Sequence, residues 1–225
     1  MNNRIWSLLI LFCLFSCVSG RKIIVENNFD KSFGSENTRD LEKYVERFEE
    51  LVLIPNYPTG TLTEKYKLFA KACSEKGVLD ALPATQLYLS DFRKSQAWYE
   101  VYAQVDSVWV GKYEQLDARV IYHSEDGVKN IGTIGYPTRR VSDIDSLKTA
   151  ILKWQVWNNR GKYINALKKI RTQNAFINEY YRLKTTVGEI SSQLFCDMLI
   201  RYNLDFENKL IRSIIAVEFA RIQVN

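Results

Sequence analysis

The sequence DFENKLIRSIIAVEFA, residues 205–220, closes a longer stretch, Ser142–Val224, in which apolar residues recur at helical spacing. Its own apolar residues lie mostly three or four positions apart, with others beside them: Phe206, Leu210, Ile211, Ile214, Ile215, Val217 and Phe219. Such spacing is typical of a helix, and Asp205 is placed to cap it. Because this helix is apolar on a wide arc, we expect it at the centre of the fold.

Start signals precede the earlier helical runs of this stretch. Ser142 and Asp145 have capping-box spacing, with Asp in place of the usual Glu or Gln, which predicts a helix from about Asp143. The Asn-Asn-Arg-Gly sequence at 158–161 then predicts a break or a kink in this helix. A second apolar run follows over residues 163–181.

One more start signal stands before the last helix. Thr186 and Glu189 form a fuller capping box, so a third helix should open at Val187. Asn203 is a plausible stop for that helix. The last third of the chain therefore predicts a mainly α fold.

A helix is also predicted near the start of the mature chain, beginning at Asn37 or Thr38. Its apolar residues follow i, i+3 and i+4 spacing: Leu41, Tyr44, Val45, Phe48 and Leu51. Glutamates occupy the positions between them, which indicates a solvent-facing side. This pattern is that of an amphipathic helix packed on a core.

Two shorter helices are expected next. One starts at Thr61 or Thr63 and ends where Gly77 can serve as its C′ residue. The other has Pro83 in its first turn and extends through Leu87. Both would pack against the C-terminal helices.

The apolar residues in the middle of the chain, residues 90–116, fit both the helical spacing and the alternation of a strand. Its Tyr and Val residues fall on a helical stripe, yet part of the run also alternates as a strand does. We expect a helix to about Val105. Residues 118–123 and 128–136 then predict two strands, joined by a turn at 124–127 whose glycine supplies a positive φ.

Length and composition fit one domain with a sizeable core. The 225 residues are 46% hydrophobic with only 4 prolines and 10 glycines, unlike a disordered chain. We predict a mainly α, helical bundle-like single domain over residues 37–225 with a small β-hairpin insert at about 117–136. Residues 21–36 mix charged and small polar residues without a period and are expected to form a tether.

Residues 1–20 have the features of an export signal. Arg4 is followed by the apolar run Ile5–Val18, which is too short to span a bilayer comfortably. Cleavage after Gly20 would free a secreted or periplasmic chain. The sequence Leu-Phe-Ser-Cys ending at Cys17 instead resembles the lipobox of bacterial lipoproteins, in which the cysteine becomes the lipidated N-terminus. We favour this second interpretation, which anchors the protein in a membrane of the cell envelope.

Cys73 and Cys196 would be the only other cysteines left after processing. Both fall on apolar helical stripes, where burial is usual. Outside the cytosol they could pair, provided that their Cα atoms come within about 7 Å. We expect buried free thiols in preference to a disulfide.

Several classes of chemistry lack the residues that they need. His123 is the only histidine and is expected at a strand end as a surface or hydrogen-bonding residue, so a metal site or a His-dependent nucleophile has no support. There is no Gly-x-Ser-x-Gly elbow. No phosphate loop or dinucleotide fingerprint is present either. We therefore expect no cofactor, no metal and no assigned catalytic residue.

One catalytic alternative needs no histidine, because a carboxylate pair can hydrolyse a glycosidic bond. The middle segment offers both carboxylates and rings: Asp91, Glu100, Asp106 and Glu114, with Trp98, Tyr99, Tyr102, Trp109 and Tyr113. Aromatic residues at helical spacing belong to the core more often than to a sugar platform. A hydrolase of an envelope polysaccharide is accordingly the alternative, and a protein that acts by binding is the main interpretation.

Basic charge is concentrated in one segment. Between Thr138 and Lys184, eleven Lys and Arg residues stand against three acidic ones, which gives +8, whereas the whole chain carries +5. Four of the basic residues are candidates for a surface that binds an anionic envelope component: Lys162, Lys168, Lys169 and Arg171. The export signal argues against nucleic acid as the partner. A solvated helix face without a partner is the plain alternative.

Overall fold

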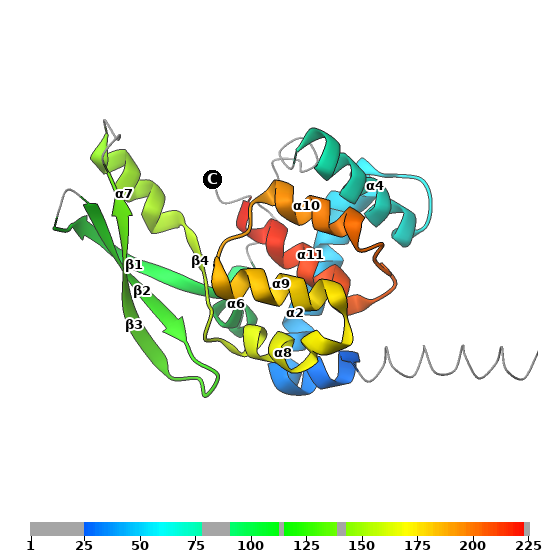
Figure 1. Ribbon diagram of the computed structural model, residues 1–225, viewed down its shortest axis with the longest axis horizontal. Helices are drawn as coiled ribbons and strands as arrows, with labels where there is room; N and C mark the ends of the chain where they lie inside the picture. Colours follow the sequence, from blue (N-terminus) through cyan, green and yellow to red (C-terminus); the bar gives the residue numbers. More distant parts are fainter. Residues whose placement is uncertain (1–24, 78–90, 113–114, 139–142, 223–225) are drawn as a thin grey trace, which may run out of the picture.

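A computed structural model describes residues 25–77, 91–112, 115–138 and 143–222. These residues form two parts (Figure 1). We call the larger part the helical body (residues 25–77, 91–101 and 158–222) and the smaller part the sheet lobe (residues 102–112, 115–138 and 143–157). The sheet lobe projects from one side of the helical body. The fold is therefore mainly α with a β insert.

The helical body is built around its last helix. Residues 25–33 are helical, and the elements after them are α2 (Ser35–Phe48), the π-helical η1 (Glu49–Leu53), α3 (Ile54–Asn56), α4 (Leu62–Lys76), the 3-10 helix η3 (Phe92–Lys94), α6 (Gln96–Val101), α8 (Lys162–Ile170), the 3-10 helix η4 (Arg171–Gln173), α9 (Ala175–Thr186), α10 (Ser192–Arg201) and α11 (Lys209–Ile222). Every residue from 213 to 220 is buried. The central position predicted for this helix is confirmed.

The ring of Phe219 shows how α11 joins the other helices. Its centroid lies 6.3 Å from that of Phe48 in α2 and 4.9 Å from that of Phe69 in α4. On another side it lies 5.8 Å from the ring of Phe195 in α10. One side chain thus contacts three helices that are far apart in the sequence, and Figure 1 shows α11 between them.

The first two predicted helices are confirmed with small shifts. α2 begins at Ser35, two residues before Asn37, after Gly34 with φ 98°. Four of its five predicted core residues are buried: Leu41, Tyr44, Val45 and Phe48. α4 starts after Thr61, whose side chain and that of Glu64 form a capping box, and ends at Gly77. The short helix predicted after Pro83 lies outside the residues that the structure describes.

Two predicted helix starts are displaced to neighbouring polar residues. α7 (Ile144–Lys153) begins where expected, but Asp143 is its cap and accepts a hydrogen bond of 2.9 Å from Ser146 N. α11 is capped by Asn208, which accepts from Leu210 N at 2.9 Å, rather than by Asp205. Asp205 instead accepts from Glu207 N, in the turn before the helix.

The helix expected to open at Val187 is present, but it begins five residues later. α9 continues to Thr186, whose hydroxyl donates to Arg182 O at 2.8 Å, so this residue ends one helix and does not cap the next. Gly188 follows with φ 82°. α10 begins only at Ser192, capped by Ser191. The predicted stop at Asn203 agrees with its left-handed φ of 43°.

The stretch expected to be a tether belongs to the core from residue 25 onward. Residues 25–33 are helical, and Phe29 and Phe33 are buried. Their ring centroids lie 5.8 and 5.5 Å from that of Tyr163 in α8. The tether prediction is wrong for this part because Val25, Phe29 and Phe33 form an i, i+4, i+8 stripe among polar neighbours.

The sheet lobe contains four strands, not only a hairpin. They are β1 (Tyr102–Val110), β2 (Gln115–His123), β3 (Lys129–Pro137) and β4 (Gln155–Trp157), antiparallel in the order β3-β2-β1-β4. The β2–β3 hairpin and the positive φ of Gly127, 81°, are as predicted. The helix predicted to about Val105 ends at Val101, because Tyr102 pairs with Trp157 of β4.

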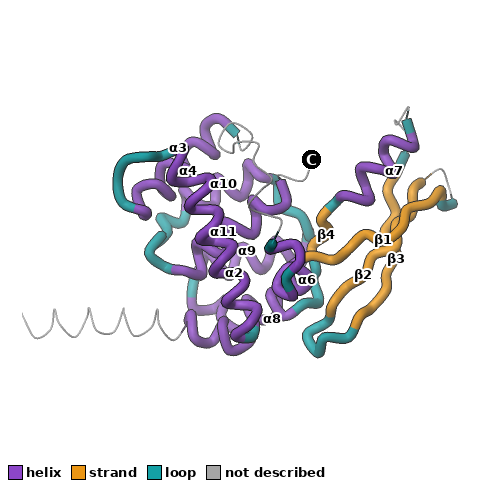
Figure 2. The backbone as a smooth tube through the Cα atoms, turned by 180° about the vertical axis from the view of Figure 1, so that it is seen from behind, coloured by secondary structure: helices purple, strands orange, loops and turns teal. Residues whose placement is uncertain are grey.

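Helix α7 covers part of one face of the sheet. Ile151 of α7 is buried with Leu116 and Ala118 of β2, and Leu147 packs against them. The ring centroids of Tyr136 and Trp154 lie 5.0 Å apart. The lobe therefore has a small core of its own, separate from that of the helical body. Figure 2 shows the sheet and α7 beside the helices of the body.

Candidate functional site

A disulfide joins two helices of the body. Cys73 of α4 and Cys196 of α10 are fully buried and bonded, with their Cα atoms 5.7 Å apart. The preference for free thiols is therefore wrong. Each cysteine was correctly placed on an inward stripe, but only the packing of α4 against α10 brings the two stripes together.

A buried carboxylate lies at the junction between the lobe and the body. Glu100 of α6 has no exposed surface. Its Oε1 accepts from Gln96 Nε2 at 3.2 Å, and its Oε2 accepts from the backbone N of Lys162 at 2.9 Å. Lys162 Nζ lies 4.0 Å from Oε1. The carboxylate thus faces the N-terminus of α8, where negative charge is favourable, and both of its oxygens already have partners.

Asn158 ties the same junction together. It is fully buried, and its Nδ2 donates to Tyr99 O at 3.0 Å and to His123 O at 2.8 Å. The chain then passes so close to α6 that a Cβ on Gly161 would lie 2.1 Å from Glu100 O. Sequence reasoning recognised these residues only as a break, because their buried partners are distant in the sequence.

His123 belongs to this junction and not to the surface. It is 8% exposed, and its ring stacks on that of Tyr99 with centroids 5.4 Å apart. Its Nδ1 lies 3.3 Å from Gln96 Nε2. Burial lowers its pKa from the usual value. Of the two roles expected for this histidine, the structure supports the hydrogen-bonding one.

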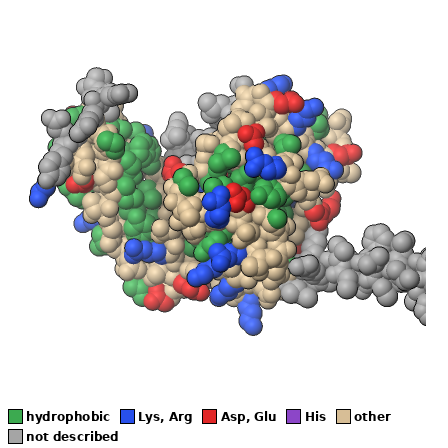
Figure 3. Space-filling model, viewed as in Figure 1, with side chains coloured by type: hydrophobic (Ala, Val, Ile, Leu, Met, Phe, Trp, Pro, Cys, Tyr) green, Lys and Arg blue, Asp and Glu red, His purple; other side chains and the backbone are tan. Residues whose placement is uncertain are grey.

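The four candidate basic residues lie on α8 and η4, in different settings. Lys162 is half-buried beside Glu100, and Lys169 pairs with Glu125 of the β2–β3 turn at 3.5 Å. The guanidinium of Arg171 lies 4.7 Å from the ring centre of Tyr181. Lys168 is exposed, and no ion pair among the described residues involves it. Figure 3 shows Lys and Arg side chains over α8 and α9 on this face.

In the fold, several basic residues of the segment 138–184 form ion pairs, so its surface carries less unpaired positive charge than the sequence suggests. Three of its lysines pair with glutamates from outside the segment: Lys162 with Glu100, Lys169 with Glu125 and Lys184 with Glu218. Lys148 and Arg182 pair within it, with Asp145 and Glu179. Near α8, Lys168 and Arg171 have no ion pair among the described residues. Together with the exposed Lys169 they form a smaller basic surface, which we call the α8 surface.

Lys184 is not part of any surface. Its side chain is 1% exposed, and its Nζ lies 2.6 Å from Oε1 of Glu218, which is 4% exposed. Tyr180 donates to the same oxygen at 2.6 Å, and burial with the charge of Glu218 raises the Tyr180 pKa well above its usual value. The ammonium also lies 4.2 Å from the ring centre of Trp157. This buried cluster links α9 to α11.

The candidate carboxylates of the middle segment lie in separate environments. Glu100 is enclosed at the junction, whereas Asp106 forms an ion pair with Arg119 on the sheet. Asp91 lies beside η3 at the edge of a pocket. Glu114 is outside the described residues. Among the three that can be placed, no pair faces a common cleft.

The aromatic residues of the same segment do not form a platform. Trp98 and Tyr102 are buried in the core, with ring centroids 4.3 Å apart. The ring of Tyr99 stacks on that of His123, and Trp109 is exposed on β1. Tyr113 lies outside the described part. These rings mainly build the core, in agreement with the more common role of such spacing.

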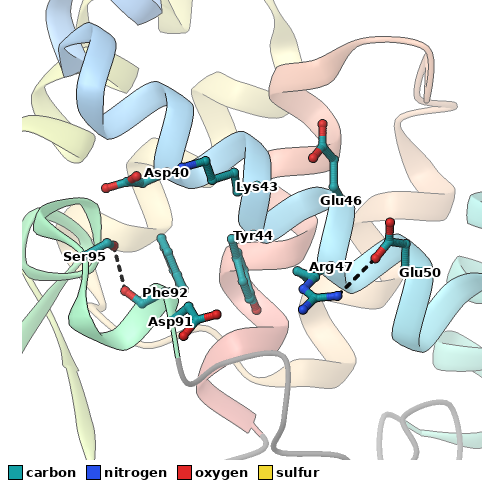
Figure 4. A pocket seen from close by; sticks show the side chains of 9 residues that line it. All are labelled: Asp40, Lys43, Tyr44, Glu46, Arg47, Glu50, Asp91, Phe92 and Ser95. Atoms are coloured by element: carbon teal, nitrogen blue, oxygen red, sulfur yellow. Dashed lines mark hydrogen bonds and ion pairs between the residues drawn. The ribbon is translucent and has the colours of Figure 1, made fainter.

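The pocket beside Asp91 has a volume of about 410 Å³ and lies between α2 and the start of α6 (Figure 4). Its floor is the stacked pair Tyr44 and Phe92, with ring centroids 4.2 Å apart, both nearly inaccessible to solvent. Its walls are charged side chains, including the ion pair of Arg47 with Glu50 at 3.4 Å. A sugar ring would therefore meet charged groups here and not an aromatic face.

Comparisons with other proteins add no assignment. No protein-family model, curated protein or solved structure matches this chain. Within the described ranges, no group of three or more His, Cys, Asp or Glu residues could hold a metal ion, and no helix there is long and apolar enough to cross a membrane. Cys17 lies outside those ranges.

Proposed function

We propose that this is an exported cell-envelope protein, tethered to a membrane by lipid on Cys17, that acts by binding and not by catalysis. The observation that carries the proposal is the disulfide between Cys73 and Cys196. Stable disulfides form in oxidising compartments outside the cytosol. The bond therefore supports the export that residues 1–20 predict.

The binding part of the proposal rests on the α8 surface. Lys168 and Lys169 are exposed on neighbouring positions of α8, and Arg171 follows in the next turn. Only Lys169 among them has an ion pair in the described structure, at an exposed position where such pairs contribute little. Beyond a membrane, the matching ligands are anionic lipid head groups or phosphorylated glycans. We assign an anionic envelope component to this surface.

Charge reversal on α8 tests the binding proposal. Each lysine near an anionic membrane contributes about 1 kcal/mol, so Lys168→Glu with Lys169→Glu should lower vesicle binding by a factor of about 30 or more. The measurement is co-sedimentation with vesicles that contain anionic lipid, at low and at physiological salt. Screening should weaken wild-type binding at the higher salt.

The matched control makes the same charge change on another helix. Lys67→Glu with Lys71→Glu alters two exposed lysines of α4 and should leave co-sedimentation close to that of the wild type. Circular dichroism spectra of both variants should match the wild type. Equal loss in the two double variants, or no wild-type binding at low salt, would refute a specific α8 surface.

The lipid anchor is tested at the mature N-terminus. If Cys17 is lipidated, mass spectrometry should find an acylated cysteine there, and Cys17→Ser should release the protein from the membrane fraction or leave it unprocessed. Cys13→Ser, in the same apolar run, should change neither result. An unmodified Arg21 as the first residue of the wild type would instead establish ordinary cleavage after Gly20.

A further inference from the structure

Strand β3 has a free edge. It ends the sheet order β3-β2-β1-β4, and within the described residues it pairs only with β2. Figures 1 and 2 show it from opposite sides as the outermost strand of the sheet lobe. It is nine residues long, so its unpaired backbone groups form an extended row.

Two hydrogen bonds at the ends of β2 fix which backbone groups point outward. In an antiparallel ladder, pairs that exchange hydrogen bonds alternate with pairs that do not. Gly111 N donates to Gln115 O at 2.8 Å, and Ser124 N donates to Val128 O at 3.0 Å. The first bond joins β2 to β1, so Gln115 and the other odd-numbered residues of β2 bond to β1. The second joins β2 to β3, so Ser124 and the even-numbered residues of β2 bond to β3. The two bonds therefore give the same assignment.

The register then assigns the residues of β3. The even-numbered residues of β2 lie opposite Asn130, Gly132, Ile134 and Tyr136. These four therefore bond to β2. The N–H and C=O groups of Ile131, Thr133 and Gly135 point to the free edge.

This edge lacks the features that usually prevent pairing. Edge strands are commonly protected by inward charges, prolines or bulges. Here the only charged residue, Lys129, and the only proline, Pro137, stand at the two ends, and residues 130–136 carry no charge. The β2–β3 register is continuous, without a bulge. The side chain of Ile131 is 69% exposed.

We propose that β3 pairs with β3 of a second copy of this chain, antiparallel about Thr133. In this register Ile131 lies opposite Gly135 of the second copy, and Gly132 lies opposite its Ile134. Each large side chain thus faces a glycine, on both faces of the sheet. The three residues whose backbone groups point outward also face one another, because Thr133 pairs with itself and Ile131 pairs with Gly135.

The match between the two edges identifies the partner as a second copy. A two-fold symmetric contact requires a surface that is complementary to itself. The order Ile-Gly-Thr-Ile-Gly over residues 131–135 meets this requirement, because each isoleucine of one copy falls opposite a glycine of the other. Lys129 falls opposite Pro137, so no like charges meet. The paired edges would form one continuous sheet from both lobes and cover both copies of Ile131.

Cysteine cross-linking in the full-length protein tests the register. In Thr133→Cys the two new thiols would stand on residues with Cα atoms about 5.5 Å apart, within disulfide range. In Lys129→Cys, at another exposed position of the same strand, they would lie about 27 Å apart at 3.4 Å per residue. We expect a reducible covalent dimer only for Thr133→Cys. No dimer for Thr133→Cys, equal dimers for both variants, or an adduct that is not twice the chain mass would overturn the proposal.

A proline tests the backbone pairing without relying on thiols. Thr133→Pro removes an N–H that points outward and is not used by β2, a position where an edge strand tolerates proline. Light scattering of the purified full chain should find a dimer for the wild type and for Thr133→Val, and a monomer for Thr133→Pro with unchanged circular dichroism. A wild-type monomer at all concentrations, or a dimer of the proline variant, would contradict the proposal. If the proline variant does not fold, the cross-linking comparison decides.

Discussion

Replacing Glu218 by glutamine is expected to lower the free energy of unfolding by about 3 to 5 kcal/mol. The carboxylate neutralises Lys184, whose side chain is 1% exposed, at an N–O distance of 2.6 Å. Glutamine keeps the shape and an acceptor for Tyr180 but removes the negative charge that lies against the buried ammonium. The cation–π contact with Trp157, at 4.2 Å, contributes less than the lost ion pair. Urea unfolding followed by circular dichroism measures the change.

A second substitution separates the charge from the packing. Adding Lys184→Met to Glu218→Gln removes the buried ammonium as well, so most of the lost stability should return, as observed for buried pairs replaced by neutral groups. The coupling between the two sites should then be several times larger than for distant residues. A double variant that is no more stable than Glu218→Gln would mean that the ion pair is not what stabilises this part of the core.

Lys184 also shows what the sequence could not reveal about the candidate site. In the sequence it is one more charge of a basic segment, because nothing near it marks it as buried. Its partner lies on α11, beyond α10, so only the packed fold brings the two together. The same holds for Glu100, which was a candidate catalytic carboxylate until its contacts with Gln96 and Lys162 placed it inside the junction.

The fold was predicted most accurately where a periodic apolar pattern extends over many residues. The apolar repeat of α11 correctly predicted a central helix, and the turn at 124–127 correctly predicted a hairpin. Helix starts were predicted less accurately where several polar residues can act as the cap. Both Asp205 and Asn208 accept backbone hydrogen bonds, and Asn208 is the residue that caps α11. Local spacing does not contain that information.

Tyr102 illustrates the remaining kind of error. Its spacing from Trp98 suits a helix, and the two side chains are indeed neighbours in the core. The residue nevertheless starts β1, because Trp157 of β4 supplies a pairing partner from a distant part of the chain. A non-local strand partner decides between two periods that the sequence satisfies equally.

Removal of the disulfide is expected to lower the free energy of unfolding by about 5 kcal/mol, the loop-entropy value for a closed loop of this size. The two cysteines lie 123 positions apart in the sequence, so the bond restricts more than half of the unfolded chain. The comparison is urea unfolding of the wild type with Cys73→Ala plus Cys196→Ala. Because the bond also holds α4 against α10, we expect the loss to appear mainly as faster unfolding.

A reductant provides the matched control for that experiment. Dithiothreitol should destabilise the wild type toward the level of the double alanine variant and leave the double variant unchanged, since it has no bond between these positions. Thiol titration of the unfolded wild type should show that Cys73 and Cys196 are oxidised before reduction. Two free thiols in the purified protein, or equal stability with and without reductant, would remove both the predicted stabilisation and the main support for folding in an oxidising compartment.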